Sequence, residues 1–327
     1  MTAIGIYGFG HIGRLVAKVA LERGYELSGV VDIDPKLIGR DVGEVLGIGE
    51  KLGVHVTSDP GELAYSDVVV HSTGSYLDKV YDQLVKLIDL EVNVLSTCET
   101  LSFPYYRYPT LAKRLDEKAL RRNVTVLGSG INPGFLLDAL LVVLSAPFDG
   151  VKRIHAVRSL DAAKRREPFR KKIGLGLEVE EARRKIESGE LSGHVGYAES
   201  ALLVASALGA SVDSVEEAQE VIVAEEDRES AGIRVERGRV MGVRGHGSVS
   251  SGNRELVRVE FIASLGAEEF EEITIEGNSY SVRWRSTGTP GDMGTASVIV
   301  NLAERIGDYG PGLLTMIDLL PFRPRFI

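Results

Sequence analysis

The chain has 327 residues, of which 44% are hydrophobic and 26% are charged. This length predicts two domains, each long enough to bury its own core. The formal net charge of −9 argues against a nucleic-acid-binding protein, which needs a dense Lys and Arg surface to contact phosphates. The single cysteine, Cys98, excludes an intramolecular disulfide framework and a Cys-rich metal site.

The hydropathy pattern predicts no membrane partner. The longest apolar run, 135–144, is interrupted by Asp138 and is far shorter than the ~20 residues of a membrane span. The first strand is expected almost at Met1, so no signal or transit peptide is expected, and the protein is predicted to be cytoplasmic. Gln occurs only twice and Arg outnumbers Lys about two to one, which is a trait of thermophile proteins.

The first ~130 residues alternate short apolar runs with helical patterns, which predicts a parallel sheet with right-handed crossovers. In the segment 11–23, apolar residues recur with helical spacing, and Gly24 follows as a stop signal. The predicted buried strands are 3–7, 27–31, 68–72, 92–96 and 124–128.

After about residue 150 the pattern changes to an α+β domain. Gly-Asn pairs at 252–253 and 277–278 predict hairpin turns, so the sheet should be antiparallel or mixed. A helix at 293–306 is expected to return to the first domain, and the tail 313–327 is expected to form an ordered wrap. The other predicted elements are helices 178–188 and 194–208 and strands 240–250, 256–265, 270–276 and 280–286.

Three glycines form a G-x-G-x-x-G motif between the first predicted strand and the first predicted helix. Gly8 would permit a tight turn, Gly10 a close approach of the backbone to a pyrophosphate, and Gly13 close packing of helix on strand. This context predicts a Rossmann-type doubly wound α/β domain that binds a dinucleotide. Its candidate cofactor-binding residues are Gly8, Phe9, Gly10, His11, Ile12 and Gly13.

Asp32 lies 19 positions after Gly13, at the end of the second predicted strand. An acid at this place accepts hydrogen bonds from ribose hydroxyls and repels a 2′-phosphate, which favours NAD over NADP. The alternative is a turn residue in Asp-Ile-Asp-Pro. The nearby basic residues that leave NADP use open are Arg14, Lys36 and Arg40.

Ligands of an open α/β sheet bind outside the carboxyl ends of its strands, where three more segments fall. Ser72, Thr73 and Gly74 could contact the nicotinamide half of the cofactor, or form an ordinary strand-to-helix turn. Asn132 and Pro133, in a Gly-rich loop, also suit nicotinamide contact. Asp138 is interpreted as an acid at a helix N-terminus rather than as a catalytic group.

Glu99 is the only acid in the segment 96–100, which follows another strand. A carboxylate there is a candidate general acid or base, and the alternative is a residue that caps the next helix. Cys98 could instead be a nucleophile, as in phosphorylating aldehyde dehydrogenases. Because Pro104 and Pro109 leave no long helix beside it, a small buried residue is favoured.

These motifs are combined with S-T-C-E at 96–99, G-S-G-I-N-P-G-F at 128–135, A-A-K-R-R-E-P at 162–168 and G-H-V-G-Y-A-E-S at 193–200. The combination resembles the 2,4-diaminopentanoate dehydrogenase family, which includes native amine dehydrogenases and is related to dihydrodipicolinate reductase. The resemblance implies NAD(P)-dependent oxidative deamination of an amine or diamino acid, reversible as reductive amination of a ketone with ammonia.

The same resemblance implies residue roles. Glu99 matches the catalytic glutamate, Asn132 a cofactor-proximal asparagine, and Arg158 and His194 substrate-pocket positions. From its own chemistry Arg158 could bind a carboxylate or be a surface charge, and His194 could bind substrate, position Arg158 or be packed structurally. Leu160 departs from a polar pocket residue of the family, which leaves the substrate open. The basic run 164–172 is interpreted as a solvated face.

The expected organisation is a Rossmann domain at 1–134, completed by 290–327, and a domain for substrate binding and oligomerisation at 135–289. An apolar face of its sheet predicts a homodimer. The His-His-x-x-Lys-x-Asp-x-Pro-Ser-Gly-Thr segment of dihydrodipicolinate reductase is missing, which disfavours but does not remove imine reduction as an alternative. A non-catalytic NAD-binding sensor is the second alternative.

Overall fold

The structure is a computed structural model that describes residues 2–321 and 326. These residues form two compact units. The first runs to Phe135 and resumes at Pro290–Leu320, and the second comprises Leu136–Thr289 with Pro321 and Phe326. Within the described part of the chain, no helix is both long enough and apolar enough to cross a membrane.

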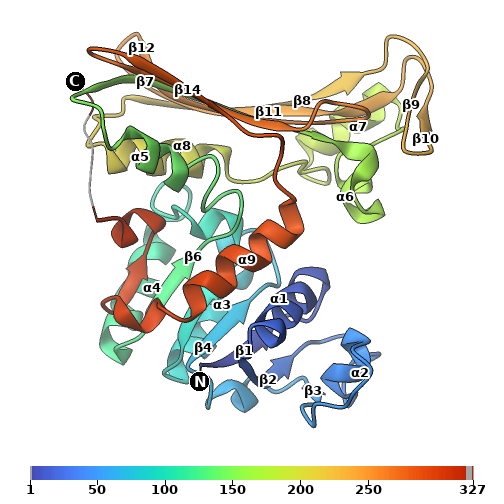
Figure 1. Cartoon of the computed structure of the whole chain (residues 1–327), viewed down its shortest axis with the longest axis vertical. Helices are drawn as coiled ribbons and strands as arrows, with labels where there is room; N and C mark the ends of the chain where they lie inside the picture. Colours follow the sequence, from blue (N-terminus) through green and yellow to red (C-terminus); the bar gives the residue numbers. More distant parts are fainter. Residues whose placement is uncertain (1, 322–325, 327) are drawn as a thin grey trace. The chain divides into compact units, whose positions relative to one another are not determined.

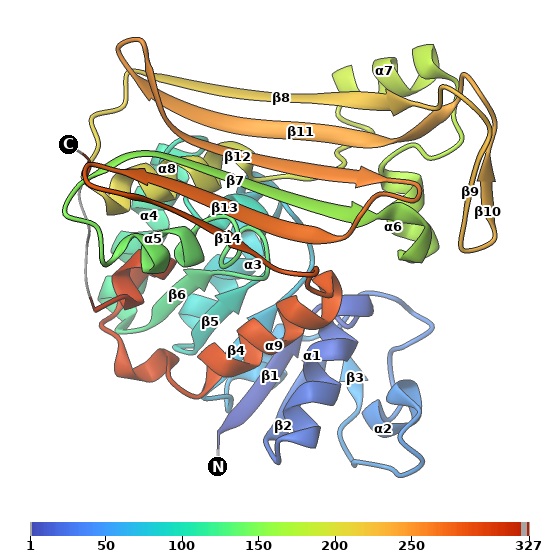
Figure 2. The same cartoon turned by 45° about the horizontal axis from the view of Figure 1, so that its top comes forward.

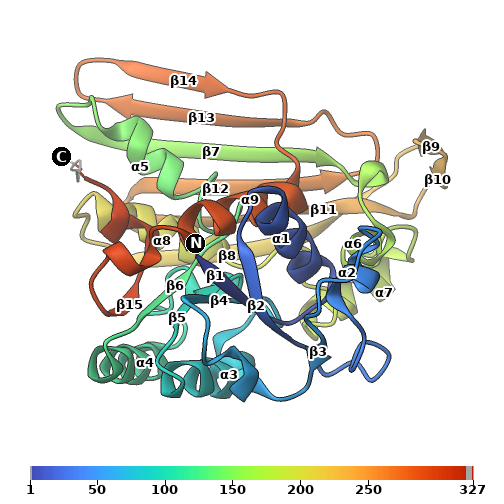
Figure 3. The ribbon, with the colours of Figure 1, turned by 60° about the horizontal axis from the view of Figure 1, so that its bottom comes forward.

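The first unit is built on a seven-stranded parallel sheet in the order β15-β6-β5-β4-β1-β2-β3, which confirms the predicted doubly wound class. The helices α1 and α9 lie on one face and α3 and α4 on the other (Figure 3). The strands are β1 (Ala3–Tyr7), β2 (Glu26–Val31), β3 (Val56–Thr57), β4 (Val68–His71), β5 (Asn93–Ser96), β6 (Thr125–Gly128) and β15 (Gly312–Leu314). The helices are α1 (His11–Glu22), α2 (Val42–Leu46), α3 (Leu77–Asp89), α4 (Pro109–Arg122) and α9 (Gly291–Ala303).

Apolar stripes at helical spacing hold these layers together. One face of α3 buries Leu77, Val80, Leu84, Leu87 and Ile88 against the sheet and α4. Each such side chain contributes about 1.5–3 kcal/mol relative to an exposed one. As predicted, α9 returns to the first unit, where it packs on α1.

The start of the tail differs from the prediction of a wrap. Gly312–Leu314 instead pairs in parallel with β6 and becomes an edge strand of the sheet. The two edge strands, β3 and β15, are two and three residues long, too short to leave an apolar run in the sequence. Residues 322–325 and 327 of the predicted wrap lie outside the described residues.

The second unit carries a six-stranded sheet in the order β14-β13-β7-β12-β11-β8 (Figure 2). The pair β7 and β12 is parallel and the other pairs are antiparallel, so the sheet is mixed. The strands are β7 (Val151–Asp161), β8 (Ser214–Val223), β11 (Val240–Ser251), β12 (Arg254–Ser264), β13 (Phe270–Gly277) and β14 (Ser281–Arg285), with a separate hairpin of β9 (Arg228–Ser230) and β10 (Ile233–Val235). Both Gly-Asn hairpins form where predicted, while the Glu-rich β8, which buries none of its residues fully, was not predicted.

The helices of this unit are α5 (Ala139–Ser145), α6 (Glu167–Lys172), α7 (Val179–Glu187) and α8 (Tyr197–Ala207). The prediction that His194 opens a helix is wrong, because α8 starts three residues later, after Gly196 at φ +98°. Asp138 caps α5, as interpreted: its carboxylate accepts the Ala139 N–H at 2.6 Å and the Ser200 hydroxyl at 3.0 Å. In the basic run, Lys164 pairs with Glu269 at 2.7 Å and Lys171 with Glu167 at 2.7 Å.

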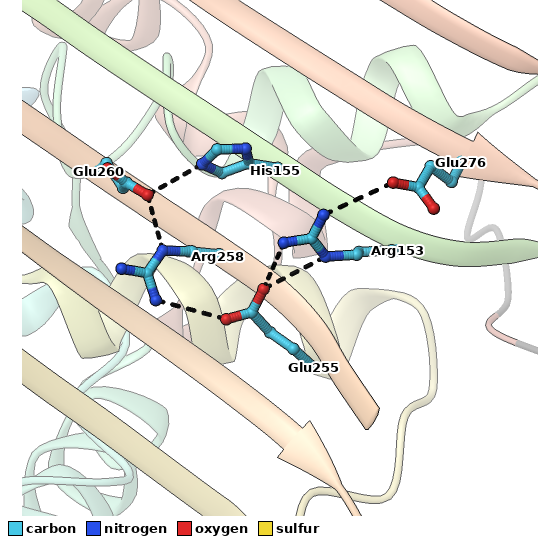
Figure 4. Close-up of polar contacts among 6 residues, drawn as sticks. All are labelled: Arg153, His155, Glu255, Arg258, Glu260 and Glu276. Carbon is cyan, nitrogen blue, oxygen red and sulfur yellow. Dashed lines mark hydrogen bonds and ion pairs between the residues drawn. The ribbon is translucent and has the colours of Figure 1, made fainter. Parts of the chain in front are cut away.

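The two faces of the six-stranded sheet differ. One is covered by α5 and α8 (Figure 1). The opposite face, which we call the outer face, carries no helix in the described part of the chain. Its side chains form a network of ion pairs (Figure 4). Arg153 pairs with Glu255 at 2.6 Å and with Glu276 at 3.5 Å. Glu260 pairs with Arg258 at 2.6 Å and with His155 at 3.0 Å, and Arg258 joins the two groups by its contact with Glu255 at 3.4 Å.

The hydrogen bond from His155 and the nearby Arg258 lower the pKa of Glu260 to about 2, so this carboxylate stays ionised. The prediction of a largely apolar sheet face is therefore wrong for the outer face. Alternate residues of each strand point to opposite faces, and the apolar residues of these strands lie mainly on the covered face.

Candidate active site

The loops that follow β4, β5 and β6 are joined in order at the carboxyl edge of the parallel sheet. In each case the amide of the first loop residue donates to the last carbonyl of the neighbouring strand. These bonds join Ser72 to Tyr7 at 2.8 Å, Thr97 to His71 at 2.9 Å and Ser129 to Ser96 at 2.9 Å. The structure therefore brings the predicted site residues in the loops after β1, β4, β5 and β6 to the same edge of the sheet.

The glycine loop has the geometry that its motif predicts. Gly8 has φ +99°, and its N–H donates to Val31 O at 2.8 Å. A Cβ on Gly13 would overlap the Gly8 carbonyl oxygen, whereas a Cβ on Gly10 would meet no protein atom within 4 Å. The N-cap of α1 is Gly10, which has no side chain that could cap the first N–H groups of this helix.

Asp32 braces the glycine loop. Its carboxylate accepts the Phe9 N–H at 2.5 Å and the Asp34 N–H at 2.8 Å, so it also makes the turn bond that the alternative interpretation describes. The next residue, Ile33, leaves 84% of its surface exposed. Arg14, one of the basic residues considered for a 2′-phosphate, donates from Nε to Phe9 O at 2.9 Å.

Glu99 starts a 3₁₀ turn, η2 (Glu99–Leu101), and its side chain is half-buried. Within residues 2–321 and 326, its carboxylate makes no hydrogen bond or ion pair, so it does not cap a helix. A Cβ on Gly128 would collide with the backbone of Leu101 and Ser102, so glycine at the end of β6 lets this turn pack closely. Burial raises the pKa of the Cys98 thiol to about 12, which disfavours the nucleophile interpretation.

The glycine-rich loop after β6 contains a cis Asn132–Pro133 bond and contacts the start of α9. The Ile131 N–H donates to Thr295 Oγ1 at 3.2 Å. A Cβ on Gly294 would lie 2.9 Å from the Ile131 side chain. Sequence reasoning missed Thr295. The sequence did offer a signal for it: the small residues Gly294 and Thr295 stand together near the start of a helix that was expected to return to this domain.

In the second unit, Arg158 is almost completely buried, so the surface-charge interpretation is wrong. Its side chain is 4% exposed and lies with Nε 3.3 Å from an oxygen of Glu271, whose side chain is 1% exposed. A terminal nitrogen of Arg158 also donates to Thr289 O at 2.9 Å. Glu271 in turn accepts hydrogen bonds from Ser286 and Thr289. The guanidinium therefore has an internal counter-charge.

Arg158 belongs to a row of residues on adjacent strands that share the helix-covered face. The row runs Glu271, Arg158, Phe261, Gly245 and Gln219. The space above Gly245 is filled by the Tyr197 ring, which would collide with a Cβ at this position. A side chain there would displace the start of α8, so the row and this helix are fitted to each other.

His194 lies against this row. Its ring centroid is 4.8 Å from that of Tyr197 and 4.9 Å from that of Phe261. Burial, with the positive charges of Lys172 and Arg158, lowers the pKa of His194 to about 3, so the imidazole is neutral. Sequence reasoning placed Arg158 and His194 in one pocket, and the structure places them in one cluster.

Comparisons with known proteins agree with this geometry. Residues 135–324 match the family described as the 2,4-diaminopentanoate dehydrogenase C-terminal domain, and residues 2–92 match the N-terminus of dihydrodipicolinate reductase. A 2,4-diaminopentanoate dehydrogenase from Acetoanaerobium sticklandii is 30% identical over 325 residues, covering 96% of this chain and 92% of that protein.

Solved structures share the fold. The amine dehydrogenase from Mycobacterium smegmatis superposes with a TM-score of 0.85 at 23% identity, covering 99% of this chain and 98% of that chain. GenD2 from gentamicin A biosynthesis, solved in complex with NAD, gives a TM-score of 0.56 at 15% identity, covering 97% and 89%. The C-terminal domain match and the 30% identity over nearly the whole chain show that this protein belongs to the 2,4-diaminopentanoate dehydrogenase family of oxidoreductases.

Proposed function

We propose that this protein is an NAD-dependent amine dehydrogenase, which converts a primary amine to a ketone and ammonia and can run in reverse. The observation that carries the proposal is the Glu99 carboxylate. It lies on the same sheet edge as the glycine loop and makes no hydrogen bond or ion pair within the described residues. The family relationship supports the same chemistry.

The residues of the first unit fit a dinucleotide. The uncapped start of α1 would hold the pyrophosphate, since the position of a Gly10 Cβ is open. Asp32 would bind the adenosine ribose, and the exposed Ile33 would face the adenine. Ser72–Gly74 and Asn132–Pro133 would contact the nicotinamide half. Arg14 already binds Phe9 O, which favours NAD, and NADP use stays a prediction.

Glu99 handles the proton in this mechanism. When bound, NAD supplies the acceptor for a hydride from the carbon that carries the amine. The substrate ammonium must first lose a proton, because only the neutral amine nitrogen can donate its lone pair to the carbon. A Glu99 carboxylate oxygen accepts this proton. Water then adds to the iminium carbon, and ketone and ammonia leave. In reductive amination Glu99 returns the proton.

The buried Arg158–Glu271 pair favours one substrate class over another. The Acetoanaerobium sticklandii relative is named for 2,4-diaminopentanoate, which carries a carboxylate. If Arg158 contacts substrate here, Glu271 already neutralises its charge. We therefore propose an amine without a carboxylate at this position as the preferred substrate, with 2,4-diaminopentanoate itself as the second candidate.

We also propose that two copies associate through the outer face. Its ion pairs hold long side chains in fixed positions, which lowers the entropy lost on association. Half-buried Val157 and Ile262 lie between the charges on the same face. Both signs of charge are present, so the face can complement a second copy of itself. Heat tolerance stays a prediction from composition.

Glu99→Gln tests the central assignment. Gln is nearly isosteric but cannot accept the ammonium proton, so turnover of the best amine should fall by roughly 10²–10⁴-fold. NAD affinity, measured by fluorescence titration, should stay within a few-fold of wild type. Turnover close to wild type would contradict the assignment. If wild type binds NAD tightly but forms no NADH from any amine, the result would favour the non-catalytic NAD-binding sensor. If wild type reduces a cyclic imine without ammonia, the result would favour the imine reductase.

Asp32→Asn tests cofactor choice while keeping an oxygen that can accept the Phe9 N–H. Loss of the negative charge should weaken NAD binding and strengthen NADP binding, narrowing the preference by about tenfold or more. Titration with both cofactors measures the ratio. Asp34→Asn, two residues along the same turn, is the matched control and should leave the ratio unchanged. An unchanged ratio in Asp32→Asn would argue that Asp32 only braces the loop.

Glu271→Gln tests the neutralisation of Arg158. Wild type should have a higher kcat/KM for 1,3-diaminobutane than for 2,4-diaminopentanoate, its carboxylated counterpart. Glu271→Gln should shift this ratio toward the carboxylated substrate by roughly tenfold, because the positive charge of the Arg158 guanidinium is then no longer neutralised by a carboxylate. Glu272→Gln, on the outer face, is the matched control. Equal changes on both substrates would show that the pair has only a structural role.

Glu260→Lys tests the dimer. It places a cation against Arg258 and His155 and should disrupt the outer face, so a dimer held there should dissociate. Light scattering should give twice the chain mass of 35.4 kDa for wild type and a concentration-dependent fall toward one chain mass for the variant. Glu180→Lys, on exposed α7, is the control. A monomeric wild type would exclude the dimer.

A further inference from the structure

A chain of hydrogen bonds links the core of the first unit to the residue before Glu99. His71, at the end of β4, lies with Nδ1 2.9 Å from Ser96 Oγ, at the end of β5. The same hydroxyl accepts the Cys98 N–H at 3.1 Å. On the other side of the ring, His71 Nε2 lies 2.8 Å from Gln83 Oε1 on α3. Both His71 and Ser96 are completely buried.

One arrangement of hydrogens satisfies every partner in this chain. Burial lowers the pKa of His71 to about 4, so the ring is neutral and has one N–H donor and one acceptor. If Nε2 carries the proton, it donates to Gln83, and Nδ1 accepts the Ser96 hydroxyl. The Ser96 oxygen then keeps its lone pairs for the Cys98 N–H. The other tautomer would leave the Ser96 hydroxyl without an acceptor in this chain.

The residue after Glu99 is also fixed. The Thr100 hydroxyl accepts the Leu77 N–H at 2.8 Å, and the Thr100 N–H donates to Ser75 O at 3.1 Å. Cys98 and Thr100 are therefore both held by buried bonds. The Glu99 carbonyl oxygen also accepts the Ser102 hydroxyl at 2.8 Å. Since the Glu99 carboxylate has no bond of its own within the described residues, its direction depends on these bonds of the backbone and of the two neighbours.

The same chain reaches the loop proposed to contact the cofactor. Thr73 Oγ1 lies 2.8 Å from His71 Nε2 and donates to Gln83 Oε1 at 2.5 Å. Ser72, beside it, donates from its hydroxyl to Gly8 O at 2.8 Å. The buried His71 ring is thus linked to the loop of Ser72 and Thr73, and through Ser72 to the glycine loop, on one side and to the Glu99 turn on the other.

We propose that Ser96 and His71 are positioning residues, which fix the Glu99 turn so that its carboxylate is aligned for proton transfer. This proposal rests on the function assigned to Glu99 above. It assigns no proton transfer to His71, whose ring stays in one tautomer. Neither residue needs to touch substrate or cofactor, so their loss should affect the rate of the chemical step rather than cofactor binding.

A double-mutant cycle of Ser96→Ala and Glu99→Gln tests the proposal. Ser96→Ala removes the acceptor for the Cys98 N–H and should lower kcat about 10- to 100-fold, as expected for a displaced catalytic group. NAD affinity should stay within about threefold. In the Glu99→Gln background, Ser96→Ala should change kcat by less than about threefold, because there is no longer a carboxylate to align.

Two further variants serve as controls. Ser145→Ala removes an equally buried hydroxyl, which donates to Leu141 O in α5 of the second unit, and should leave kcat unchanged. Gln83→Leu removes the last hydrogen-bond partner in this series, on the half-buried face of α3. Its double-mutant cycle with Glu99→Gln should show the same non-additivity, with a smaller loss of kcat. It replaces the Ser96→Ala cycle if that variant does not fold.

The possible results separate the two proposals. A wild-type kcat in Ser96→Ala, or an equal loss of kcat with and without Glu99, would overturn the positioning role. A Glu99→Gln variant with wild-type turnover would instead overturn the proposed function. A loss confined to NAD affinity would show that the chain supports the cofactor loop and not the Glu99 turn, which also overturns the positioning role.

Discussion

Backbone register at the carboxyl edge of the parallel sheet positions every proposed site residue of the first unit. Each loop begins with an amide that donates to the last carbonyl of the neighbouring strand. The distance from the glycine loop to the Glu99 turn is therefore set by strand spacing rather than by flexible side chains. A slip of one residue in this pairing would turn the strand side chains to the opposite face and move the loops with them.

Because backbone hydrogen bonds hold the loops in place, the Glu99 side chain is not needed for that purpose and stays available for chemistry. The amides of Gly8 and Ser72 and the hydroxyls of Ser72 and Ser96 all bind protein groups and hold the loops in place. The Glu99 carboxylate, in contrast, makes no hydrogen bond or ion pair in the described part of the chain, and only its backbone and its neighbours hold it in place. A general base needs this arrangement, because a carboxylate engaged in strong internal hydrogen bonds would be a weaker proton acceptor.

The sequence predicted the features that depend on local signals. The glycine motif, the ends of β1, β4, β5 and β6, and the hairpins at Gly252 and Gly277 are read from a few adjacent residues. The partners of Arg158 and Ile131 could not be predicted, because Glu271 and Thr295 lie more than 100 residues away. The start of α8 was misplaced for a different reason. The backbone enters the helix through Gly196 at a positive φ, and the apolar pattern continues across it.

The two units handle buried polar groups in different ways. In the first, His71 is kept neutral and hydrogen-bonded at both nitrogens, so burial costs only the loss of its protonated form. In the second, Arg158 cannot lose its charge and needs a carboxylate beside it, whose own oxygens are bound by Ser286 and Thr289. A neutral group transmits position through directional bonds, whereas a buried ion pair also sets the local charge. For the proposed function, the first arrangement aligns the Glu99 turn, and the second sets the choice between carboxylated and uncharged substrates.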